Sequence, residues 1–501
     1  MKKFLFIFVV LLQSCSGNSQ DQPADARFMG LEAHIDSLLA EYHAVGLSVA
    51  VVEKGTTIYA KGFGYRDYEN KLPANAQTIF GIGSCTKAFT AAVLGVERDQ
   101  GKLAFTDAPS KYIKDLSFYS GAMNDSIQIE HLLTHSSGVG NRSSESTAIL
   151  FETSNARELI PRIKYLRPAG GVGQELMYNN LMYTLAGMVG EDITGNSWAD
   201  NLQYSLFDPI GMSRTFIDFA PGVAKGNYSL GYVVDSITPT TVMPEVMVTR
   251  APAGAIFSTA DDMSLWLKTW LAKGKIGGKQ VLPTSYVSDA ISERILWPSN
   301  PNDTTNVASK YYGYGWITWE DRGYRRVEHS GGVSGYGSNV VFFPEAGIGL
   351  VVLTNQTASS LPYSVTSEIV SRILPILEND PHEAQFVQVQ TILPADTPTT
   401  INKELPPSLD LSNFVGAYQH PGFGKVTVSY EGETLYAEFP MTRLRLTHHE
   451  NNVFHDHYTM EVPMVMWNFM QLDFRANYAG KIDTLMINLD AVLVAFERVV
   501  D

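Results

Sequence analysis

The most distinctive local feature of the sequence is Ser84, followed three residues later by Lys87. Ser84 follows Gly81 and Gly83 and opens a run with helical spacing, so the Lys87 ammonium is expected to share a helix face with the Ser84 hydroxyl and to reach it. A serine hydroxyl is a poor nucleophile until a nearby base takes its proton, and a desolvated lysine can help to do this. The pair therefore predicts nucleophilic chemistry, with helix capping by Ser84 as the alternative.

Two further clusters could complete such a site. The segment 178–180 (Tyr-Asn-Asn) lies between a loop rich in Pro and Gly and an expected helix that begins at Leu181. The segment 329–332 (His-Ser-Gly-Gly) ends an expected strand. Taken singly, each has an ordinary structural interpretation as a loop anchor, a helix cap or a strand end. Their combination with Ser84 is what favours a catalytic site.

In their order and rough spacing, the three clusters resemble the signatures of penicillin-recognising, beta-lactamase-related serine hydrolases: Ser-x-x-Lys, Tyr-x-Asn, and Lys-Thr-Gly or its His-x-Gly variant. Three other segments also resemble habits of this family, namely 131–138 (His-Leu-Leu-Thr-His-Ser-Ser-Gly), 207–212 and 254–260. The resemblance covers about Ala26 to Leu377. It implies an α/β fold with an antiparallel sheet flanked by helices, plus a helical subdomain.

The resemblance also implies catalytic roles. Ser84 would attack a carbonyl and form an acyl-enzyme, while Lys87 and Tyr178 would shuttle the proton. Tyr178 would activate the water that deacylates the enzyme. No cofactor and no metal are implied, because these groups suffice for acyl transfer from an amide or an ester. The alternatives are a penicillin-binding sensor that acylates with little turnover, and a binding lipoprotein with a vestigial hydrolase half.

Substrate-binding roles follow from the same resemblance for Asn180, His329, Gly331 and Gly332. Asn180 is expected to bind a substrate amide, and the N–H groups of Ser84 and Gly332 are expected to form the oxyanion hole. True beta-lactamases usually carry a lysine at the position of His329. Because histidine is mostly neutral near pH 7, recognition of a substrate carboxylate is weakened, which favours the esterase and D-amino-acid peptidase branches of the family.

Other reactive residue types are interpreted structurally. Cys85 has no His/Asn context and is expected to be a buried small hydrophobe. A cluster of four histidines has a spacing that fits no usual metal site and is better explained by alternating strand positions: His448, His449, His455 and His457. The lipase-type Gly-x-Ser-x-Gly elbow is absent, which argues against an α/β-hydrolase fold.

Changes in the period of the hydrophobic pattern mark the helices and strands that must position these residues. A helix is expected over about 26–42, followed by a hairpin that turns at Lys54-Gly55. Helical patterns dominate from Ser84 to about Asp261. A last helix is expected from about Ser364 until Pro375. The late strand signals, which have no helix between them, should pair as antiparallel neighbours, and they cover 314–319, 324–328, 338–343 and 348–354.

A second, smaller unit follows. Residues 379–407 turn polar and proline-bearing and are interpreted as a linker between a hydrolase domain at 26–378 and a C-terminal unit at 408–501. Short strand candidates with Gly-rich turns begin with Phe414 to Tyr418 and predict a small all-β sandwich or barrel. This unit resembles the lipocalin-like domain often appended to these hydrolases.

The N-terminus predicts export. Residues 1–15 form a short leader in which Lys2 and Lys3 precede an apolar run, and they end at Cys15 as in a bacterial lipoprotein signal. Residues 16–25 are then a tether, and the protein is expected to be lipid-anchored and to face the periplasm. An ordinary secretory signal is the alternative. The formal charge of −15, with no basic cluster to counter it, argues against a nucleic-acid partner. A small-molecule or peptide substrate is implied by the resemblance, and the oligomeric state stays open.

Overall fold

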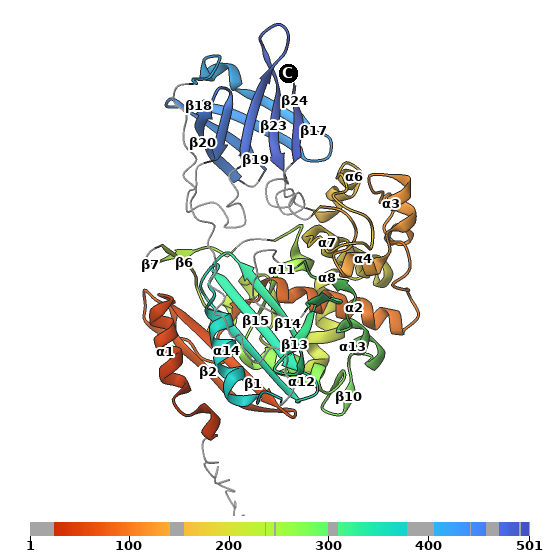
Figure 1. Cartoon of the computed structure of the whole chain (residues 1–501), viewed down its shortest axis with the longest axis vertical. Helices are drawn as coiled ribbons and strands as arrows, with labels where there is room; N and C mark the ends of the chain where they lie inside the picture. The colour runs from red at the N-terminus through yellow and green to blue at the C-terminus, as the bar shows by residue number, and fades with distance from the viewer. Residues whose placement is uncertain are drawn as a thin grey trace, which may run out of the picture.

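The structure is a computed structural model, and it describes residues 25–140, 155–235, 237–244, 247–298, 309–377, 405–440, 442–456, 470–489 and 492–499. The predicted leader with Cys15 and most of the predicted linker lie outside these ranges, so the lipid anchor remains a prediction. Among the described helices, none is both long enough and apolar enough to cross a membrane. The described chain forms an α/β part and, at one end of the molecule, a closed β-barrel (Figure 1).

The α/β part is built on a nine-stranded sheet in which each recorded strand pair is antiparallel. The sheet joins sequence-distant segments, because β16 pairs with β1. In spatial order the strands are β11 (Ile295–Leu296), β12 (Tyr311–Tyr312), β13 (Ile317–Asp321), β14 (Tyr324–Val333), β15 (Tyr336–Phe343), β16 (Ile348–Thr354), β1 (Gly46–Glu53), β2 (Thr56–Asp67) and β3 (Leu72–Pro73). The predicted antiparallel pairing of the late strands is confirmed.

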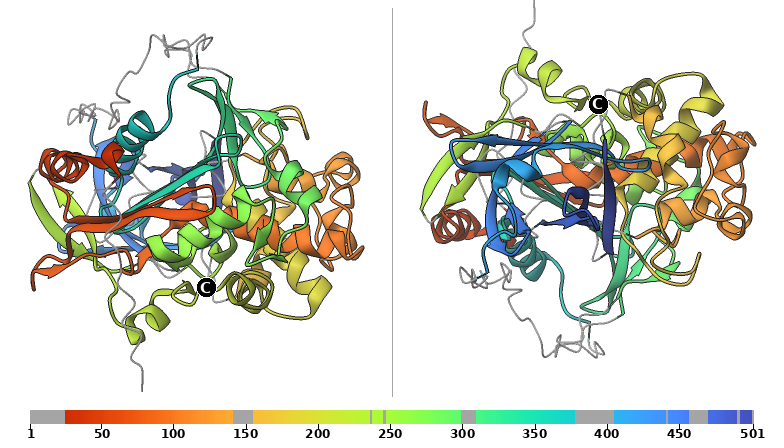
Figure 2. Two further views of the ribbon diagram at one scale, coloured as in Figure 1. Left: turned by 90° about the horizontal axis from the view of Figure 1, so that it is seen from below. Right: turned by 90° about the horizontal axis from the view of Figure 1, so that it is seen from above.

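Both faces of the sheet are covered. Successive side chains of a strand point to opposite faces, so one strand contributes to two cores. On β1, Leu47, Val49 and Val51 join the core under α1 (Leu31–Glu41) and α14 (Leu361–Ile373). The alternate residues Ala50 and Val52 join the core that contains α12 (Ala260–Leu271) and the helical region. Figure 2 shows α1 and α14 together on one side of the strands. The α14 helix begins slightly earlier than predicted and ends before Pro375, as expected.

The middle of the chain is mainly helical, as predicted. Its two longest helices, α2 (Thr86–Asp99) and α7 (Asn180–Thr194), pack together, and the short helix α11 (Ala251–Gly254) contacts both. The other described α-helices are α3 (Gly121–Ser126), α4 (Ile129–Leu133), α6 (Ile160–Ile163), α8 (Trp198–Leu202), α9 (Asp208–Ile210), α10 (Phe219–Ala224) and α13 (Thr284–Ala290).

The sequence did not predict the short strands around and within this helical region. Three of them form a small sheet in the order β4 (Phe80–Gly81), β8 (Ile256–Ser258) and β5 (Phe216–Ile217). Two hairpins, β6–β7 and β9–β10, cover Gly231–Asp235 with Thr238–Val242 and Lys275–Ile276 with Lys279–Gln280. The small sheet matters for function, because β4 leads directly into Ser84.

The C-terminal unit is a closed eight-stranded barrel, which confirms the predicted all-β fold and selects the barrel over the sandwich. Closure comes from the pairing of β17 with β24. The strands are β17 (Gly416–His420), β18 (Gly424–Glu431), β19 (Thr434–Phe439), β20 (Thr442–Glu450), β21 (Val453–Asp456), β22 (Gln471–Ala476), β23 (Ile482–Leu489) and β24 (Val492–Val499).

Phe414 corrects one strand prediction. It lies in a short 3-10 helix (Leu411–Phe414) rather than in the first strand, and its fully buried ring lies 5.5 Å from the ring of Phe454 and 5.0 Å from that of Phe474, between ring centroids. A large aromatic side chain that joins the barrel core from outside the strands explains why the segment leaves the strand pattern.

Candidate active site

Ser84 lies in a tight turn between β4 and α2. The turn is a 3-10 segment (Gly83–Cys85), and Gly83 has φ of +49°, in the left-handed region that favours glycine. A Cβ atom on Gly83 would lie 2.7 Å from the backbone nitrogen of Gly332, so β14 approaches the turn too closely for any side chain there. The local sequence thus brings Ser84 and the end of β14 together.

The Ser84 hydroxyl accepts a hydrogen bond from Lys87, with 2.9 Å between Oγ and Nζ. It does not cap the helix: the N-cap position of α2 is Cys85, and neither the 3-10 turn nor α2 has a side-chain cap bond at its start. The capping alternative therefore does not describe this structure. Lys87 is fully buried and also donates to the carbonyl oxygen of Ala253 at 3.0 Å, so its amine is held between the serine and α11.

Tyr178 lies beside the same amine. The Nζ atom of Lys87 is 4.7 Å from the centroid of the Tyr178 ring and 5.5 Å from that of Tyr183, distances at which an aromatic face attracts a cation. The predicted helix after Tyr178 is α7, and it begins at Asn180. Its N-cap is Asn179, whose side chain accepts from the N–H of Met182 at 3.3 Å. Asn180 is therefore the first residue of the helix and not its cap.

His135 is a neighbour of the site that sequence reasoning did not single out. Its ring is fully buried and lies 4.1 Å from the Tyr178 ring, between centroids, and its Nδ1 accepts from the backbone N–H of Asn179 at 3.0 Å. Burial, together with the charge of Lys87, holds the pKa of His135 well below its usual value, so the ring is neutral. His135 thus fixes the segment that carries Tyr178.

His329 lies on β14 with its ring buried and both nitrogens bound. The Nδ1 atom donates to the carbonyl oxygen of Ser330 at 2.6 Å, so Nε2 is the acceptor for the hydroxyl of Tyr312 at 2.9 Å. Burial, followed by the nearby charge of Lys87, lowers the pKa of His329 to about 3. The ring is therefore neutral at physiological pH and carries no positive charge toward a ligand.

This neutral histidine makes stability depend on pH. An unfolded histidine binds a proton below about pH 6.5, whereas folded His329 binds one only near pH 3. The contribution of His329 to the stability of the fold is therefore complete above pH 6.5 and is lost as the pH falls toward 3. We expect the free energy of unfolding of the wild type to fall faster between pH 6.5 and 4 than that of His329→Gln, by up to about 1.4 kcal/mol per pH unit. Urea unfolding at several pH values measures this difference, and parallel curves for the two proteins would contradict it.

The two glycines of the third cluster have different surroundings. A Cβ atom on Gly331 would lie 2.0 Å from the carbonyl oxygen of Ile82, so Gly331 is required for the contact between β14 and the turn of Ser84. A Cβ atom on Gly332 would meet no protein atom within 4 Å, so open space lies beside this backbone unit. Gly331 therefore has a steric role in the fold, and a ligand has room beside the Cα atom of Gly332.

Two aromatic residues extend the site beyond the predicted set. Tyr312 lies 6.3 Å and Trp297 6.4 Å from the Tyr178 ring, between centroids. Both approach edge-on, and they form a wall next to Tyr178 together with His135. No periodicity or motif in the sequence marks these two residues, because only the pairing of β12 with its neighbours brings them to the site.

Cys85 is buried, as predicted. Its Sγ lies 3.2 Å from the carbonyl oxygen of His329, and burial raises the pKa of the thiol to about 12, so it stays protonated. In the described part of the chain, no group of three or more His, Cys, Asp or Glu side chains is arranged to hold a metal ion, and His457 lies outside the described ranges.

Comparisons with known proteins show similarities over both parts of the chain. Residues 31–366 match the family described as "Beta-lactamase", and residues 401–498 match a domain of unknown function described as DUF3471. Protein flp of Staphylococcus aureus (strain NCTC 8325 / PS 47) is 25% identical over 335 residues, which cover 66% of this chain and 64% of the relative. The match thus spans less than two thirds of that relative.

A longer match and a similar structure extend the comparison. The unguisins hydrolase ungD' of Aspergillus campestris is 26% identical over 436 residues, covering 81% of this chain and 78% of the relative. The octameric penicillin-binding protein homologue from Pyrococcus abyssi has a similar fold, with a TM-score of 0.62 and 22% identity over 94% of this chain and 99% of the homologue. Ser84 is half-buried, its hydroxyl is bonded to the buried amine of Lys87, and the ring of Tyr178 lies beside that amine.

Proposed function

This chain belongs to the beta-lactamase family, and we propose that it is a serine hydrolase that forms an acyl-enzyme on Ser84 and transfers the acyl group to water. The observation that carries the proposal is the hydrogen bond between the Lys87 amine and the Ser84 hydroxyl, in a turn where that hydroxyl has no capping role. The family generally consists of serine hydrolases, and a relative is named a hydrolase.

Acylation begins when the Ser84 oxygen adds to the substrate carbonyl and its proton passes to the Lys87–Tyr178 pair. Negative charge then develops on the carbonyl oxygen, and the backbone N–H groups of Ser84 and Gly332 stabilise it. The open space beside Gly332 supports this placement, because it leaves room for the carbonyl oxygen. The proton then moves to the leaving amine or alcohol, and the acyl group remains on Ser84.

Deacylation repeats the sequence with water as the nucleophile. The charge of Lys87 stabilises Tyr178 as a phenolate. This phenolate takes the proton of the attacking water and passes it to the Ser84 oxygen as that oxygen leaves. The ring of Tyr178 is held by its packing against His135, which supports a fixed position for the phenol. Asn180, at the start of α7, binds the amide of the acyl part of the substrate.

The substrate is an amide or an ester that needs no recognised carboxylate, so a peptidase or esterase role is favoured over efficient penicillin hydrolysis. His329 supports this choice: its ring is neutral, and its nitrogens bind Tyr312 and Ser330 instead of pointing a positive charge at a ligand. A carboxylate at this place would meet a neutral imidazole at position 329 instead of a fixed cation.

A substrate panel tests this proposal. The purified protein is incubated with p-nitrophenyl esters, D-amino-acid p-nitroanilides and a chromogenic cephalosporin, and kcat/KM is measured for each. We expect turnover of an ester or an anilide and a markedly lower kcat/KM for the cephalosporin. A cephalosporin that is the best substrate would overturn the preference. Lasting acylation without turnover of any compound would favour the sensor alternative.

Tyr178→Phe tests the role of the phenol. Phenylalanine keeps the ring beside Lys87 and removes the hydroxyl, so we expect deacylation to slow by about 100-fold or more, since general base catalysis contributes at least this much. Acylation is expected to slow less, and an acyl-enzyme should accumulate in rapid-quench mass spectrometry. An unaltered lifetime of the acyl-enzyme would contradict this role.

Tyr183→Phe is the matched control. Its ring also faces the Lys87 amine, at 5.5 Å, but its hydroxyl donates to the carbonyl oxygen of Leu133 at 2.7 Å and so is engaged in the fold. This variant is expected to lose stability while the lifetime of its acyl-enzyme stays near that of the wild type.

A further inference from the structure

The small sheet of β4, β8 and β5 brings Ser84 and Asp218 to one edge. Both outer strands run antiparallel to β8, so they run in the same direction and their carboxyl ends meet at the same edge. From this edge β4 continues to Ser84, and the residue after β5 is Asp218. Because neighbouring strands lie about 4.8 Å apart, the two outer strands are separated by about 10 Å, with the start of β8 between them.

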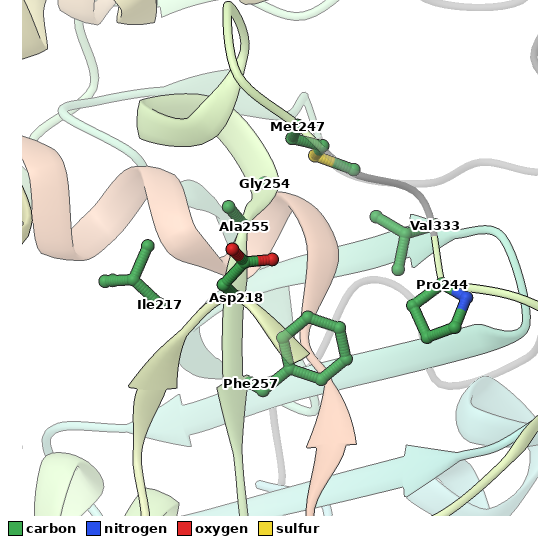
Figure 3. A pocket seen from close by; sticks show the side chains of 8 residues that line it. All are labelled: Ile217, Asp218, Pro244, Met247, Gly254, Ala255, Phe257 and Val333. Atoms are coloured by element: carbon green, nitrogen blue, oxygen red, sulfur yellow. The ribbon is translucent and has the colours of Figure 1, made fainter. Parts of the chain in front are cut away.

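A pocket of about 60 Å³ opens at this edge. One water molecule needs about 10–15 Å³ of such space, so the pocket has room for a substituent of a few heavy atoms. In the described part of the chain eight residues line it, of which seven are apolar and the eighth is Asp218; they are Ile217, Asp218, Pro244, Met247, Gly254, Ala255, Phe257 and Val333. Figure 3 shows the Asp218 carboxylate among Ile217, Ala255 and Phe257.

The pocket adjoins the backbone of the turn that precedes Ser84. A Cβ atom on Gly254 would lie 3.9 Å from the carbonyl carbon of Gly83, the residue before the nucleophile. Val333, another lining residue, directly follows Gly332. A group that fills the pocket therefore lies next to the turn of Ser84 and next to the proposed oxyanion hole.

Asp218 is anchored and still able to bind a ligand. Its backbone N–H donates to the carbonyl oxygen of Ala255 at 3.2 Å, and its side chain accepts from the N–H of Phe219 at 3.2 Å through Oδ1. A carboxylate offers about four lone-pair sites, so one such bond leaves acceptor capacity for a second donor. The side chain is exposed, which gives a ligand access to it.

Building on the acyl transfer proposed for Ser84, we propose that this pocket binds the substituent of the acyl group and that Asp218 binds a protonated amine on that substituent. The substrate class is then a short aminoacyl or aminoalkanoyl amide or ester. Among the lining residues that the structure describes, the one charged side chain is negative, which favours a cation over a neutral or acidic substituent. The buried ammonium of Lys87 repels a cation close to Ser84, so the amine is stabilised on the Asp218 side of the pocket.

Boronic acids test this proposal, because they form a reversible bond to a catalytic serine. Two isosteric pairs exchange only an ammonium for a methyl group: 1-aminoethyl- with isopropylboronic acid, and 2-aminopropyl- with isobutylboronic acid. Inhibition constants are measured with an ester substrate from the panel. In at least one pair we expect the ratio of neutral to cationic inhibition constants to fall about three- to tenfold in Asp218→Asn, and to fall in the wild type as salt is raised.

Asparagine at 218 is nearly isosteric with aspartate and keeps the side-chain acceptor for Phe219, so the backbone there, with φ of +76° and ψ of 157°, carries a side chain of the same size and branching. Asp115→Asn is the matched control, because Asp115 is also exposed, has φ of +64° and does not line the pocket. A ratio that Asp218→Asn leaves unchanged, or that Asp115→Asn lowers equally, would overturn the amine site. If no boronic acid inhibits and no substrate is turned over, the proposed hydrolase function itself fails instead.

Discussion

Ser84→Ala is expected to abolish both hydrolysis and labelling by a fluorophosphonate probe. Loss of a nucleophile that acts as a unit with its base typically costs about 10⁶-fold in kcat, so turnover should fall below detection in the substrate panel. The fold should be kept, because the Ser84 hydroxyl caps no helix and Lys87 retains the carbonyl oxygen of Ala253 as a partner. Turnover rates, probe labelling and a thermal melt measure these outcomes together.

Cys85→Ala is the control for that variant, because it changes the next residue. The Cys85 thiol is buried and protonated, so its removal is expected to leave the label and the turnover in place. Retained turnover in Ser84→Ala, or a loss of labelling in a folded Cys85→Ala, would refute the assignment of Ser84 as nucleophile.

Lys87→Met is expected to lower the acylation rate by about 10²- to 10⁴-fold, the range that a positioned general base contributes. Methionine is unbranched and fills the space of the lysine stem, and it removes the amine that is bonded to Ser84 at 2.9 Å. Stopped-flow measurement of probe acylation separates this step from deacylation.

The expected effect of Lys87→Met on stability is small. The substitution leaves the carbonyl oxygen of Ala253 without this donor, which costs about 1–3 kcal/mol of stability. It also removes the free-energy cost of burying the Lys87 amine away from water, which offsets that loss. Lys114→Met, at an exposed lysine, is the matched control and should acylate at the wild-type rate. An acylation rate of Lys87→Met within a few-fold of the wild type would refute the proton-transfer role of Lys87.

The part of the site that could be predicted from the sequence is the part that depends on local geometry. Ser84 and Lys87 are three residues apart in a helical segment, so helical geometry brings their side chains together. Tyr178 could be added only because its segment resembles a family signature. The sequence gives no distance between that segment and Ser84, and the structure supplies it through the contact of the Tyr178 ring with the Lys87 amine.

The unpredicted part depends on long-range pairing. Tyr312 lies in a two-residue strand that no periodicity marks, and it meets His329 only because β12 pairs with β13 and β13 with β14. His135 was seen as part of a family loop, but its packing against Tyr178 follows from the fold of the helical region. Asp218 was missed because the two-residue strand before it is too short to give a strand signal.

The fold shows the same division. Strands such as β16 are apolar runs bounded by turn residues and were predicted close to their observed bounds. The pairing of β16 with β1, which are about 300 residues apart in the sequence, is a tertiary contact that the strand pattern does not contain. Phe414 is a residue type that is common in strands, yet it lies in a 3-10 turn. Packing of its ring in the barrel core, beside Phe474, outweighs this local propensity.

The most direct test is the site of covalent modification. The full chain is treated with a fluorophosphonate probe, digested and mapped by tandem mass spectrometry. Our account predicts one adduct, on the oxygen of Ser84, whose rate of formation falls in Lys87→Met. An adduct on another residue, or no adduct on a folded protein that hydrolyses its substrate, would contradict the claim that this hydroxyl is the nucleophile.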